Sequence, residues 1–440
     1  KSGIMHVART PPSGARAIGM SFRLSHRPAA ARPRKALLLS SNLAQHFLLD
    51  PDVVFLNHGS FGACPRPVFE DYQRWQLRLE RQPVEFLDAR RGLKANLKLA
   101  REALALELNT AADNLAQVAN ATTGLNVVIQ SLRLGPGDEI LTTDHEYNAL
   151  EKTWAYVARK TGARVVAMPV ALPLSAAQAF HEAVAAGFSE RTRVLFLSHI
   201  TSPTALLFPI ESLVAEARRR GVFSVIDGAH TPGHIRLDLD ALGADFYAGN
   251  CHKWLMSPKG SAFVYCRPEW QAMIAPLVVS HGWTADNKQP GVRGPFGNSA
   301  FVDEVEMQGT RDPSAWLAVP AALAFRRAPD WWAVSAECTR LARETAARLA
   351  ELTGLPALAS PEFCAPQMIA MPIPPCDAQA VHDELLRAYG IEIPVFEWQG
   401  RHIVRLSCQG YNDRAQMDVL IAALSEILQL HPGAGGGRSK

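Results

Sequence analysis

The strongest constraint on the fold is the alternation of short apolar runs with amphipathic stretches between residues 115 and 265. The runs have the length of buried strands, and a segment such as 210–220 has the apolar spacing of a helix. We interpret the following runs as strands: 139–143, 163–168, 193–198, 222–227 and 260–265. This alternation predicts βαβ units and a mostly parallel sheet, hence an α/β fold. Ligands bind at the carboxyl ends of such strands, so the residues just after each run are the first candidates for a site.

The segments around this region predict a second, smaller domain. A strand at 52–57 ends in a turn, and residues 66–108 are largely helical. The stretch 282–310, rich in Gly, Pro, Asn and Asp, is expected to be an ordered functional loop. After it we predict helices at 313–328, 331–352, 378–389 and 413–430, and strands at 367–373 and 402–407. The predicted domains are 41–309 and 310–432, followed by a flexible tail at 433–440.

The net charge of +3 combines a basic N-terminal segment with a mildly acidic remainder of the chain. Residues 1–40 hold eight basic residues and no acidic one, so the other 400 residues carry a net charge of −5. We interpret residues 1–40 as a basic, disordered leader, with a transit peptide as the alternative. Phe22 is the single Phe, Tyr or Trp among its basic residues, and no binding motif follows it, so we expect no nucleic-acid partner.

The cysteine pattern and the length of the apolar stretches indicate where in the cell the protein is expected. The seven cysteines are irregularly spaced and form no C-x-x-C pair, which disfavours a disulfide framework or a structural zinc site. A reducing, cytoplasmic location fits best. The longest apolar stretch, 316–325, is half the length that a membrane span needs, so no membrane partner is expected.

Two charged residues stand where a strand-end site would need them. Asp227 ends the apolar run 222–227, and Lys253 follows a second apolar segment 26 residues later. A buried Asp is costly unless it meets a cation or a donor, and the N–H of a protonated pyridine is such a partner. Taken alone, Lys253 would be read as an ordinary surface charge. The pair makes a cofactor site the better interpretation.

Three weaker signals accompany the pair. Thr122 and Thr123 precede an apolar helix, whose free N–H groups suit a phosphate, although an ordinary Thr helix cap is the better explanation of this feature taken alone. The segment 144–148 offers a flat ring that could stack on a cofactor, or forms a polar surface loop. Arg405, in the strand predicted at 402–407, could bind a carboxylate through two N–H groups or could make a structural ion pair.

Together and in this order, these features resemble the class V aminotransferase family of fold-type I pyridoxal-phosphate (PLP) enzymes. The resemblance spans residues 50–430. Four segments look most like the isopenicillin N epimerase branch: 57–62, 120–123, 144–147 and 227–233. The resemblance implies a large domain with a seven-stranded, mostly parallel sheet, a smaller α+β domain, PLP as cofactor, and a homodimer with sites at the interface.

The resemblance also implies a role for each matching residue. Lys253 would hold PLP as a Schiff base and move the Cα proton, and Asp227 would pair with the pyridine nitrogen. His145 would stack on the ring, with Tyr147 as the competing choice, and either is a candidate second acid–base group. The other implied contacts are His230 and Ser202 at the ring oxygen, Thr122, Thr123, Asn250 and His252 at the phosphate, Thr310 at the phosphate of the partner subunit, and Arg405 and Asn57 at the substrate. Many relatives carry Ser where this chain has Asn250.

The expected reaction is racemisation or epimerisation at the α carbon of an amino acid or a derivative of one. C–S lysis and transamination stay open as alternatives. A cysteine desulfurase is disfavoured because the stretch 390–398 before Arg405 has no cysteine to accept sulfur. A catalytically inactive binding protein is disfavoured because both Lys253 and Asp227 are present.

A metal hydrolase is a further alternative, from another class of enzyme. His230 and His234, with Asp227, could be taken for metal ligands. Pro232 and Gly233 lie between the two histidines, so the pair does not sit on a helix, where this spacing would align two ligands. We therefore expect no metal.

Overall fold

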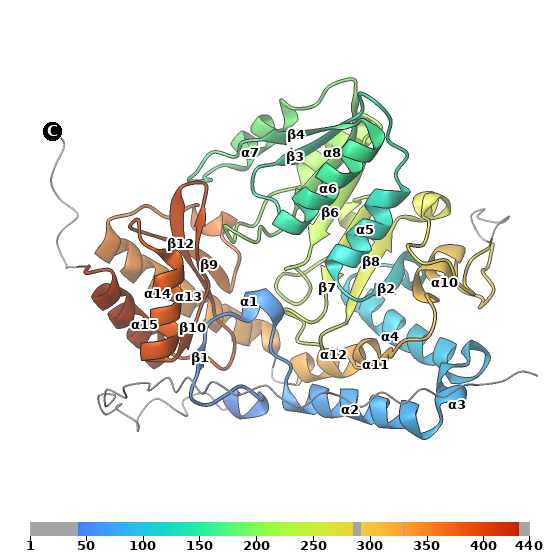
Figure 1. Ribbon diagram of the computed structural model, residues 1–440, viewed down its shortest axis with the longest axis horizontal. Helices are drawn as coiled ribbons and strands as arrows, with labels where there is room; N and C mark the ends of the chain where they lie inside the picture. Colours follow the sequence, from blue (N-terminus) through green and yellow to red (C-terminus); the bar gives the residue numbers. More distant parts are fainter. Residues whose placement is uncertain (1–42, 285–291, 329, 431–440) are drawn as a thin grey trace, which may run out of the picture. The chain divides into compact units, whose positions relative to one another are not determined.

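The computed structural model describes residues 43–284, 292–328 and 330–430 (Figure 1). The segments predicted at 1–40 and 433–440 lie outside these residues. The large sheet has seven strands in the order β2-β8-β7-β6-β5-β3-β4. Its strands are β2 (Leu115–Val118), β3 (Glu139–Thr143), β4 (Arg164–Met168), β5 (Thr192–Ser198), β6 (Phe223–Gly228), β7 (Phe246–Asn250) and β8 (Ala262–Cys266). Only β8 runs antiparallel to its neighbours, which confirms the predicted α/β fold with a mostly parallel sheet.

Both faces of this sheet are buried except at the edge strand β4, which is largely exposed, and this burial explains why the inner strands read as continuous apolar runs. Successive side chains point to opposite faces, so Ile140 belongs to one core cluster and Leu141 to the other. One face packs against α5 (Ala121–Ser131) and α6 (Asn148–Thr161). The other packs against α4 (Lys94–Glu107), α7 (Ala177–Ala185) and α8 (Glu211–Arg219). The result is three layers with the sheet in the middle.

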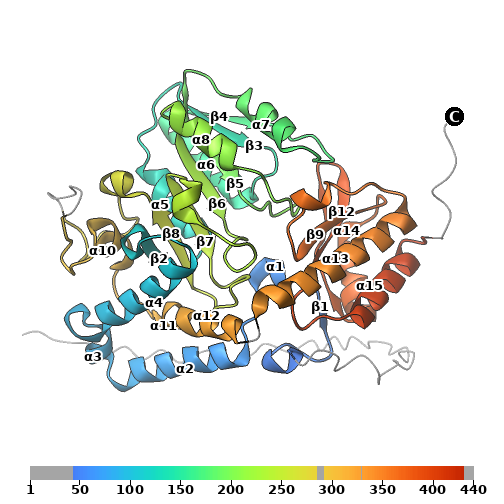
Figure 2. The same cartoon turned by 180° about the vertical axis from the view of Figure 1, so that it is seen from behind.

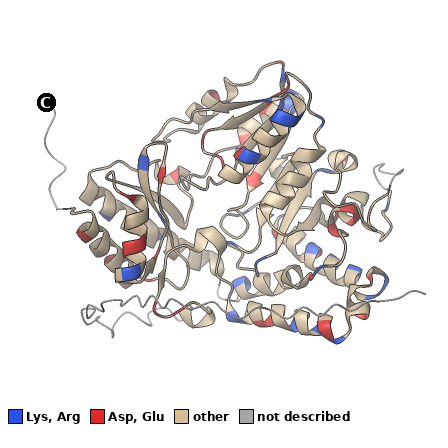
Figure 3. Cartoon of the chain, viewed as in Figure 1, with Lys and Arg blue, Asp and Glu red and all other residues tan. Residues whose placement is uncertain are grey.

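Helices preceding the sheet agree with the pattern read at residues 66–108. They are α2 (Arg66–Arg81), α3 (Pro83–Leu87) and α4, joined by a turn of π-helix at Ala89–Leu93. Basic and acidic residues are interspersed along α2, as expected for a solvated face (Figure 3). No helix in the described part of the chain combines the length and the apolar character that a membrane span needs.

A second, antiparallel sheet has the order β11-β12-β9, from β11 (Val395–Trp398), β12 (Arg401–Ser407) and β9 (Met368–Ile373). It packs with α13 (Trp331–Thr353), α14 (Ala378–Tyr389) and α15 (Arg414–Ile427) around its own core (Figure 2). The strand predicted at 52–57 is shorter than expected. It is β1 (Val54–Phe55), which pairs in parallel with β10 (Ile391–Glu392) and is followed by the short helix α1 (His58–Phe61).

Two further elements differ from the sequence-based prediction. The single helix expected at 313–328 is two helices, α11 (Ser314–Leu317) and α12 (Val319–Arg327). Pro320 stands in the first turn of α12, where its missing N–H does no harm, whereas inside one continuous helix it would remove a hydrogen bond. The expected loop 282–310 also contains a helix, α10 (Ala300–Glu306).

Tertiary packing accounts for α10. Ser299 caps the helix by accepting a hydrogen bond from the Val302 backbone, and nearly all of the helix is buried against β2. The surrounding Gly and Pro residues hid this short helix in the sequence. A further short helix is α9 (Leu239–Leu242). Helices α11 and α12 pack against α2 and α4, and the domain boundary placed at residue 310 stays a prediction.

Candidate active site

A cavity of about 680 Å³ lies where the parallel strands end, as expected for an α/β sheet. Ser198 ends β5, while Asp227 and Asn250 lie at the ends of β6 and β7. The cavity brings together most of the residues predicted from the sequence. These lining residues are Thr122, Thr123, Tyr147, Ser202, Asp227, His230, Asn250, His252 and Lys253.

Lys253 lies in the turn after β7 and is held close to His230. Its Nζ is 3.1 Å from His230 Nε2, and Trp254 Nε1 donates to His230 Nδ1 at 3.4 Å. An indole nitrogen can only donate, so His230 Nδ1 accepts and the proton of the neutral imidazole sits on Nε2. That Nε2–H faces Nζ, which must then accept with the lone pair of an unprotonated amine.

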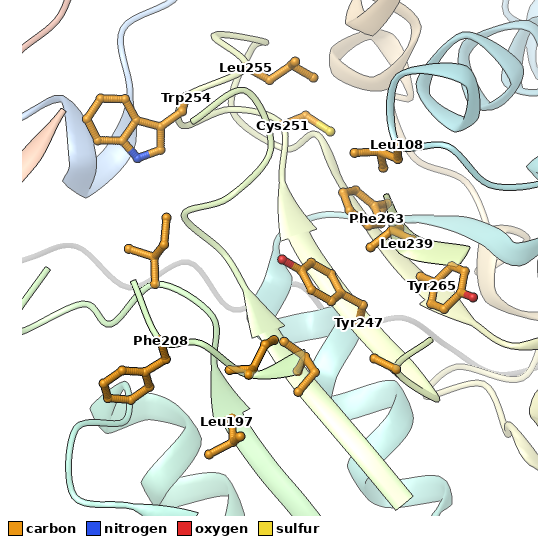
Figure 4. Close-up of a cluster of buried hydrophobic side chains, with 14 of the residues drawn as sticks. Leu108, Leu197, Phe208, Leu239, Tyr247, Cys251, Trp254, Leu255, Phe263 and Tyr265 are labelled. Carbon is orange, nitrogen blue, oxygen red and sulfur yellow. The ribbon is translucent and has the colours of Figure 1, made fainter. Parts of the chain in front are cut away.

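The electrostatics of Lys253 agree with this assignment. Burial and the nearby Arg405 guanidinium lower the pKa of Lys253 to about 7, against the attraction of Asp227. Burial and Lys253 together also hold the pKa of His230 well below its usual range, so the imidazole stays neutral. Trp254 is fixed in the core with Cys251 and Leu255, which keeps the donor to His230 in place (Figure 4).

Asp227 is buried and has a buried carboxylic acid as a neighbour. Its Oδ1 accepts from the Ala229 backbone N–H at 2.9 Å, and burial raises its pKa against that bond and the Lys253 charge. Glu146 accepts from Thr143 Oγ1 at 2.7 Å and from the N–H and Oγ of Ser198 at 2.8 and 2.6 Å. Burial and, to a lesser degree, Asp227 raise the pKa of Glu146 to about 8, against those three bonds. The sequence analysis did not single out Glu146, although it lies inside the segment 144–147.

The N-terminus of α5 forms the end of the cavity suited to a phosphate. Asn120 caps the helix, accepting from the Thr123 backbone N–H at 2.8 Å, and Asn250 Oδ1 accepts from Ala121 N–H at 2.8 Å. His252 Nδ1 donates to the Ser261 carbonyl at 3.1 Å, and burial lowers its pKa to about 4. Asn250 therefore also positions the helix, a function that its amide serves without touching a ligand.

The structure distinguishes Tyr147 from His145. Tyr147 lines the cavity and is 44% exposed. His145 is fully buried and is not among the lining residues; its Nδ1 bonds Thr204 Oγ1 at 2.8 Å, and its ring packs 4.5 Å from that of Trp398. Of the two candidates for the stacking group, only Tyr147 faces the cavity among the described residues.

Arg405 lies in β12 and does not itself line the cavity, but its guanidinium contacts two serines that do. Its Nη1 donates to Ser202 O at 2.6 Å and Oγ at 3.2 Å, and Nη2 donates to Ser60 Oγ at 3.0 Å. Its Nε–H is buried and has no hydrogen-bond partner within the described part of the chain. Asn57 does not line the cavity but contacts Ser60 and Glu392. Ser60 was not chosen from the sequence, although it lies in the segment 57–62.

Thr310 lies apart from this cavity. It lines a separate cavity of about 540 Å³, together with Arg90, His281 and Arg311. Within one chain it therefore contacts no residue of the predicted phosphate site.

The histidine that a metal hydrolase would need has other partners, and the cysteines that a desulfurase would need lie outside the cavity. His234 stacks on Trp254, and its Nε2 accepts from the Gln367 backbone. No group of three metal-ligating residues occurs among the described residues. All seven cysteines lie in the described part and are unpaired, and none lines the cavity at Lys253.

Comparison with known proteins identifies the family to which the chain belongs. Residues 64–420 match the model of the class V aminotransferase family, so the chain belongs to this family and is a PLP-dependent enzyme. The residues present fit this cofactor: a lysine whose pKa is lowered to about 7, a buried aspartate, the N-terminus of α5 and a neutral histidine surround one cavity. Lys253, Asp227, Thr122, Thr123 and His252 are the residues that would hold PLP.

Individual relatives and one solved structure are similar to this chain over most of its length. The chain is 37% identical over 394 residues to an isopenicillin N epimerase of Amycolatopsis lactamdurans, covering 88% of this chain and 98% of the relative. It is 30% identical to a probable chloroplastic L-cysteine desulfhydrase of Arabidopsis thaliana, covering 81% and 77%. A structure of a C-DES variant with glycine covalently linked to PLP has a TM-score of 0.72 at 23% identity, covering 85% and 96%, which supports the fold.

Proposed function

We propose that this enzyme inverts the configuration at the α carbon of an amino acid or an amino-acid derivative. PLP, when bound, supplies an electron sink for the charge left at the α carbon when a bond there breaks. The observation that supports inversion is that two groups able to carry a proton, the Lys253 amine and the Tyr147 phenol, line one cavity. Lys253 can take up a proton near neutral pH because its pKa is lowered to about 7.

Each residue of the cavity then has a defined task. Lys253 holds the cofactor and moves the Cα proton, and Asp227 pairs with the pyridine nitrogen. Neutral His230 keeps a proton on Nε2, directed at Lys253 and available to the ring oxygen. Tyr147 lies against the ring and returns the proton from the second side. Arg405 binds the substrate carboxylate, for which its unpartnered Nε–H is suited.

Deuterium exchange tests the inversion. When the wild type acts on one enantiomer of a substrate amino acid in heavy water, the amino acid should gain deuterium at the α carbon and lose optical activity at the same time. Tyr147→Phe should keep exchange from one face and lose racemisation by about 100-fold or more, since one acid–base group contributes at least that much. His145→Asn is the matched control and should racemise normally. Undiminished racemisation by Tyr147→Phe would exclude this residue as the second group.

A C–S lyase is the second candidate, favoured by the relatives named as cysteine desulfhydrases. No cysteine lines the cavity, and a lyase, unlike a desulfurase, needs none there. Incubation with L-cysteine distinguishes the two candidates: sulfide, pyruvate and ammonia indicate lysis, whereas D-cysteine without these products indicates inversion. Isopenicillin N, named in two relatives, belongs in the same substrate panel.

Attachment of the cofactor is tested separately. The loaded wild type should have a visible absorbance band that borohydride abolishes, with the adduct on the peptide that contains Lys253. Lys253→Ala should give no such adduct. A wild type that shows no band after incubation with PLP would overturn this assignment.

The site is proposed to be completed in a homodimer. Phe61 lines the cavity yet is 72% exposed, and the apolar run Leu277–Val279 is also exposed. Thr310, in its separate cavity, would then reach the phosphate held by the other subunit. Mixing Lys253→Ala with Thr310→Ala protein should restore activity if Thr310 acts across the interface, because one site of the mixed dimer has both residues intact. No restoration, or a monomer by light scattering, would refute the proposal.

A further inference from the structure

A chain of hydrogen bonds links Glu392 to the guanidinium of Arg405 through two side chains. Asn57 Nδ2 donates to Glu392 Oε1 at 2.9 Å, and Ser60 Oγ donates to Asn57 Oδ1 at 2.5 Å. Arg405 Nη2 donates to Ser60 Oγ at 3.0 Å. Asn57 and Ser60 are neighbours in the sequence, but Glu392 lies 335 positions from Asn57 and Arg405 lies 345 positions from Ser60, so only the fold joins the two halves of this chain of bonds.

The direction of every bond in this chain is determined by chemistry. An ionised carboxylate only accepts, so the Asn57 amide nitrogen faces Glu392 and its oxygen faces Ser60. A guanidinium only donates, so Ser60 must accept from Arg405 and give its single hydroxyl proton to Asn57. Each member therefore fixes the orientation of the next, and the relay ends on Arg405.

The backbone holds this relay in place. β1 pairs with β10, which carries Glu392, and Asn57 bridges Ser407 at the end of the strand that carries Arg405. Asn57 and Ser60 are thus fixed between the two strands that hold the ends of the relay. Gly59, between them, packs so closely that an added Cβ would lie 2.6 Å from Met368 Sδ.

The relay leaves part of the guanidinium available. Nη1 is engaged by two oxygens of Ser202 and Nη2 by Ser60 Oγ, whereas the buried Nε–H has no partner among the described residues. A buried donor without a partner needs an explanation, and a bound ligand beside the cavity supplies one. The three oxygens on the Nη groups hold the guanidinium plane still, so a carboxylate that binds the remaining N–H groups loses less entropy.

We propose that Ser60, oriented by Asn57 and Glu392, is a positioning residue that aims Arg405 at the substrate carboxylate. The inference rests on the proposed role of Arg405. It also reassigns Asn57, which acts through Ser60 and does not touch the substrate. Selectivity for α-amino acids over simple amines is therefore determined partly outside the cavity, by a carboxylate on β10.

The test measures binding of two probes to the PLP-loaded protein, through the change that each causes in cofactor absorbance. The probes are L-alanine and ethylamine, which differ by the carboxylate. Ser60→Ala should weaken L-alanine binding by about 10- to 100-fold, the effect of losing one hydrogen bond to a charged group, and leave ethylamine binding within about 2-fold. Equal loss for both probes, or no loss for either, would overturn the proposal.

Glu392 provides a matched pair that decides the question even if Ser60→Ala fails to fold. Glu392→Gln keeps an oxygen that can accept from Asn57 and should bind L-alanine like the wild type. Glu392→Met cannot accept and should lose L-alanine selectivity. Equal L-alanine selectivity in the two variants would contradict the relay. A wild type without a cofactor band refutes the proposed function instead, so the two failures are distinguishable.

Discussion

The low basicity of Lys253 is a property of the protein itself and can be measured without cofactor. Its pKa is lowered from 10.5 to about 7, which corresponds to about 5 kcal/mol in favour of the neutral amine. This energy is an upper limit because the side chain is only partly buried and faces an open cavity. At pH 8 about nine in ten Lys253 side chains would be neutral, against about one in 300 for an unperturbed lysine.

Pulsed acetylation of the cofactor-free protein followed by peptide mass analysis measures this titration. Between about pH 6 and pH 10, the labelling rate of Lys253 should rise and level off with a midpoint near 7, as set by its lowered pKa. The exposed Lys98 serves as the internal reference for the reagent. A Lys253 rate that still rises tenfold per pH unit through pH 9 would refute the reasoning.

Two variants check the causes through shifts of opposite sign. Arg405→Met removes a positive neighbour and should raise the pKa of Lys253, whereas Asp227→Asn removes a negative one and should lower it further. Shifts in the same direction would show that burial, and not these charges, determines the value.

The same shift predicts a pH dependence of stability. The unfolded chain binds a proton on Lys253 that the folded chain has lost between pH 7 and 10.5, so the free energy of unfolding rises with pH across that window. Lys253→Met should remove this slope from the cofactor-free protein. A slope that persists in the variant must come from other groups.

Three further predictions concern the surroundings of the site. Gly62 has φ +72°, and an added Cβ would lie 2.0 Å from the His252 carbonyl oxygen. Gly62→Ala should therefore weaken PLP binding at least tenfold, while Gly221→Ala, with φ +68° and open space, should not change it. Because the pKa of Glu146 is raised to about 8, the wild type should lose stability as pH rises from about 5 to 8, and Glu146→Gln should lose less; equal falls in melting temperature would contradict this. Arg101 is 1% exposed and paired with a buried carboxylate at 2.8 Å, so Arg101→Met should cost about 3–5 kcal/mol in urea unfolding; a loss below 1 kcal/mol would contradict this.

Much of the fold was predictable because its signals are local. The apolar runs that form β3, β5, β6 and β8 are continuous since both faces of the sheet are buried there, and this pattern is visible without knowledge of the contacts. Short elements escaped prediction for the opposite reason. α10 is a helix because it packs on β2, and the break at Pro320 depends on where one helix ends and the next begins.

For the site, the sequence by itself determined the lysine and the aspartate, because each follows an apolar strand and strand ends converge on one edge of a sheet. Tertiary structure alone decided that Tyr147, not His145, lines the cavity, that Thr310 lies elsewhere, and that Ser60 holds Arg405. Those facts depend on contacts between residues up to 345 positions apart. Sequence periodicity states which face of an element is buried, but not which distant side chain it meets, since that is determined by how the whole chain packs.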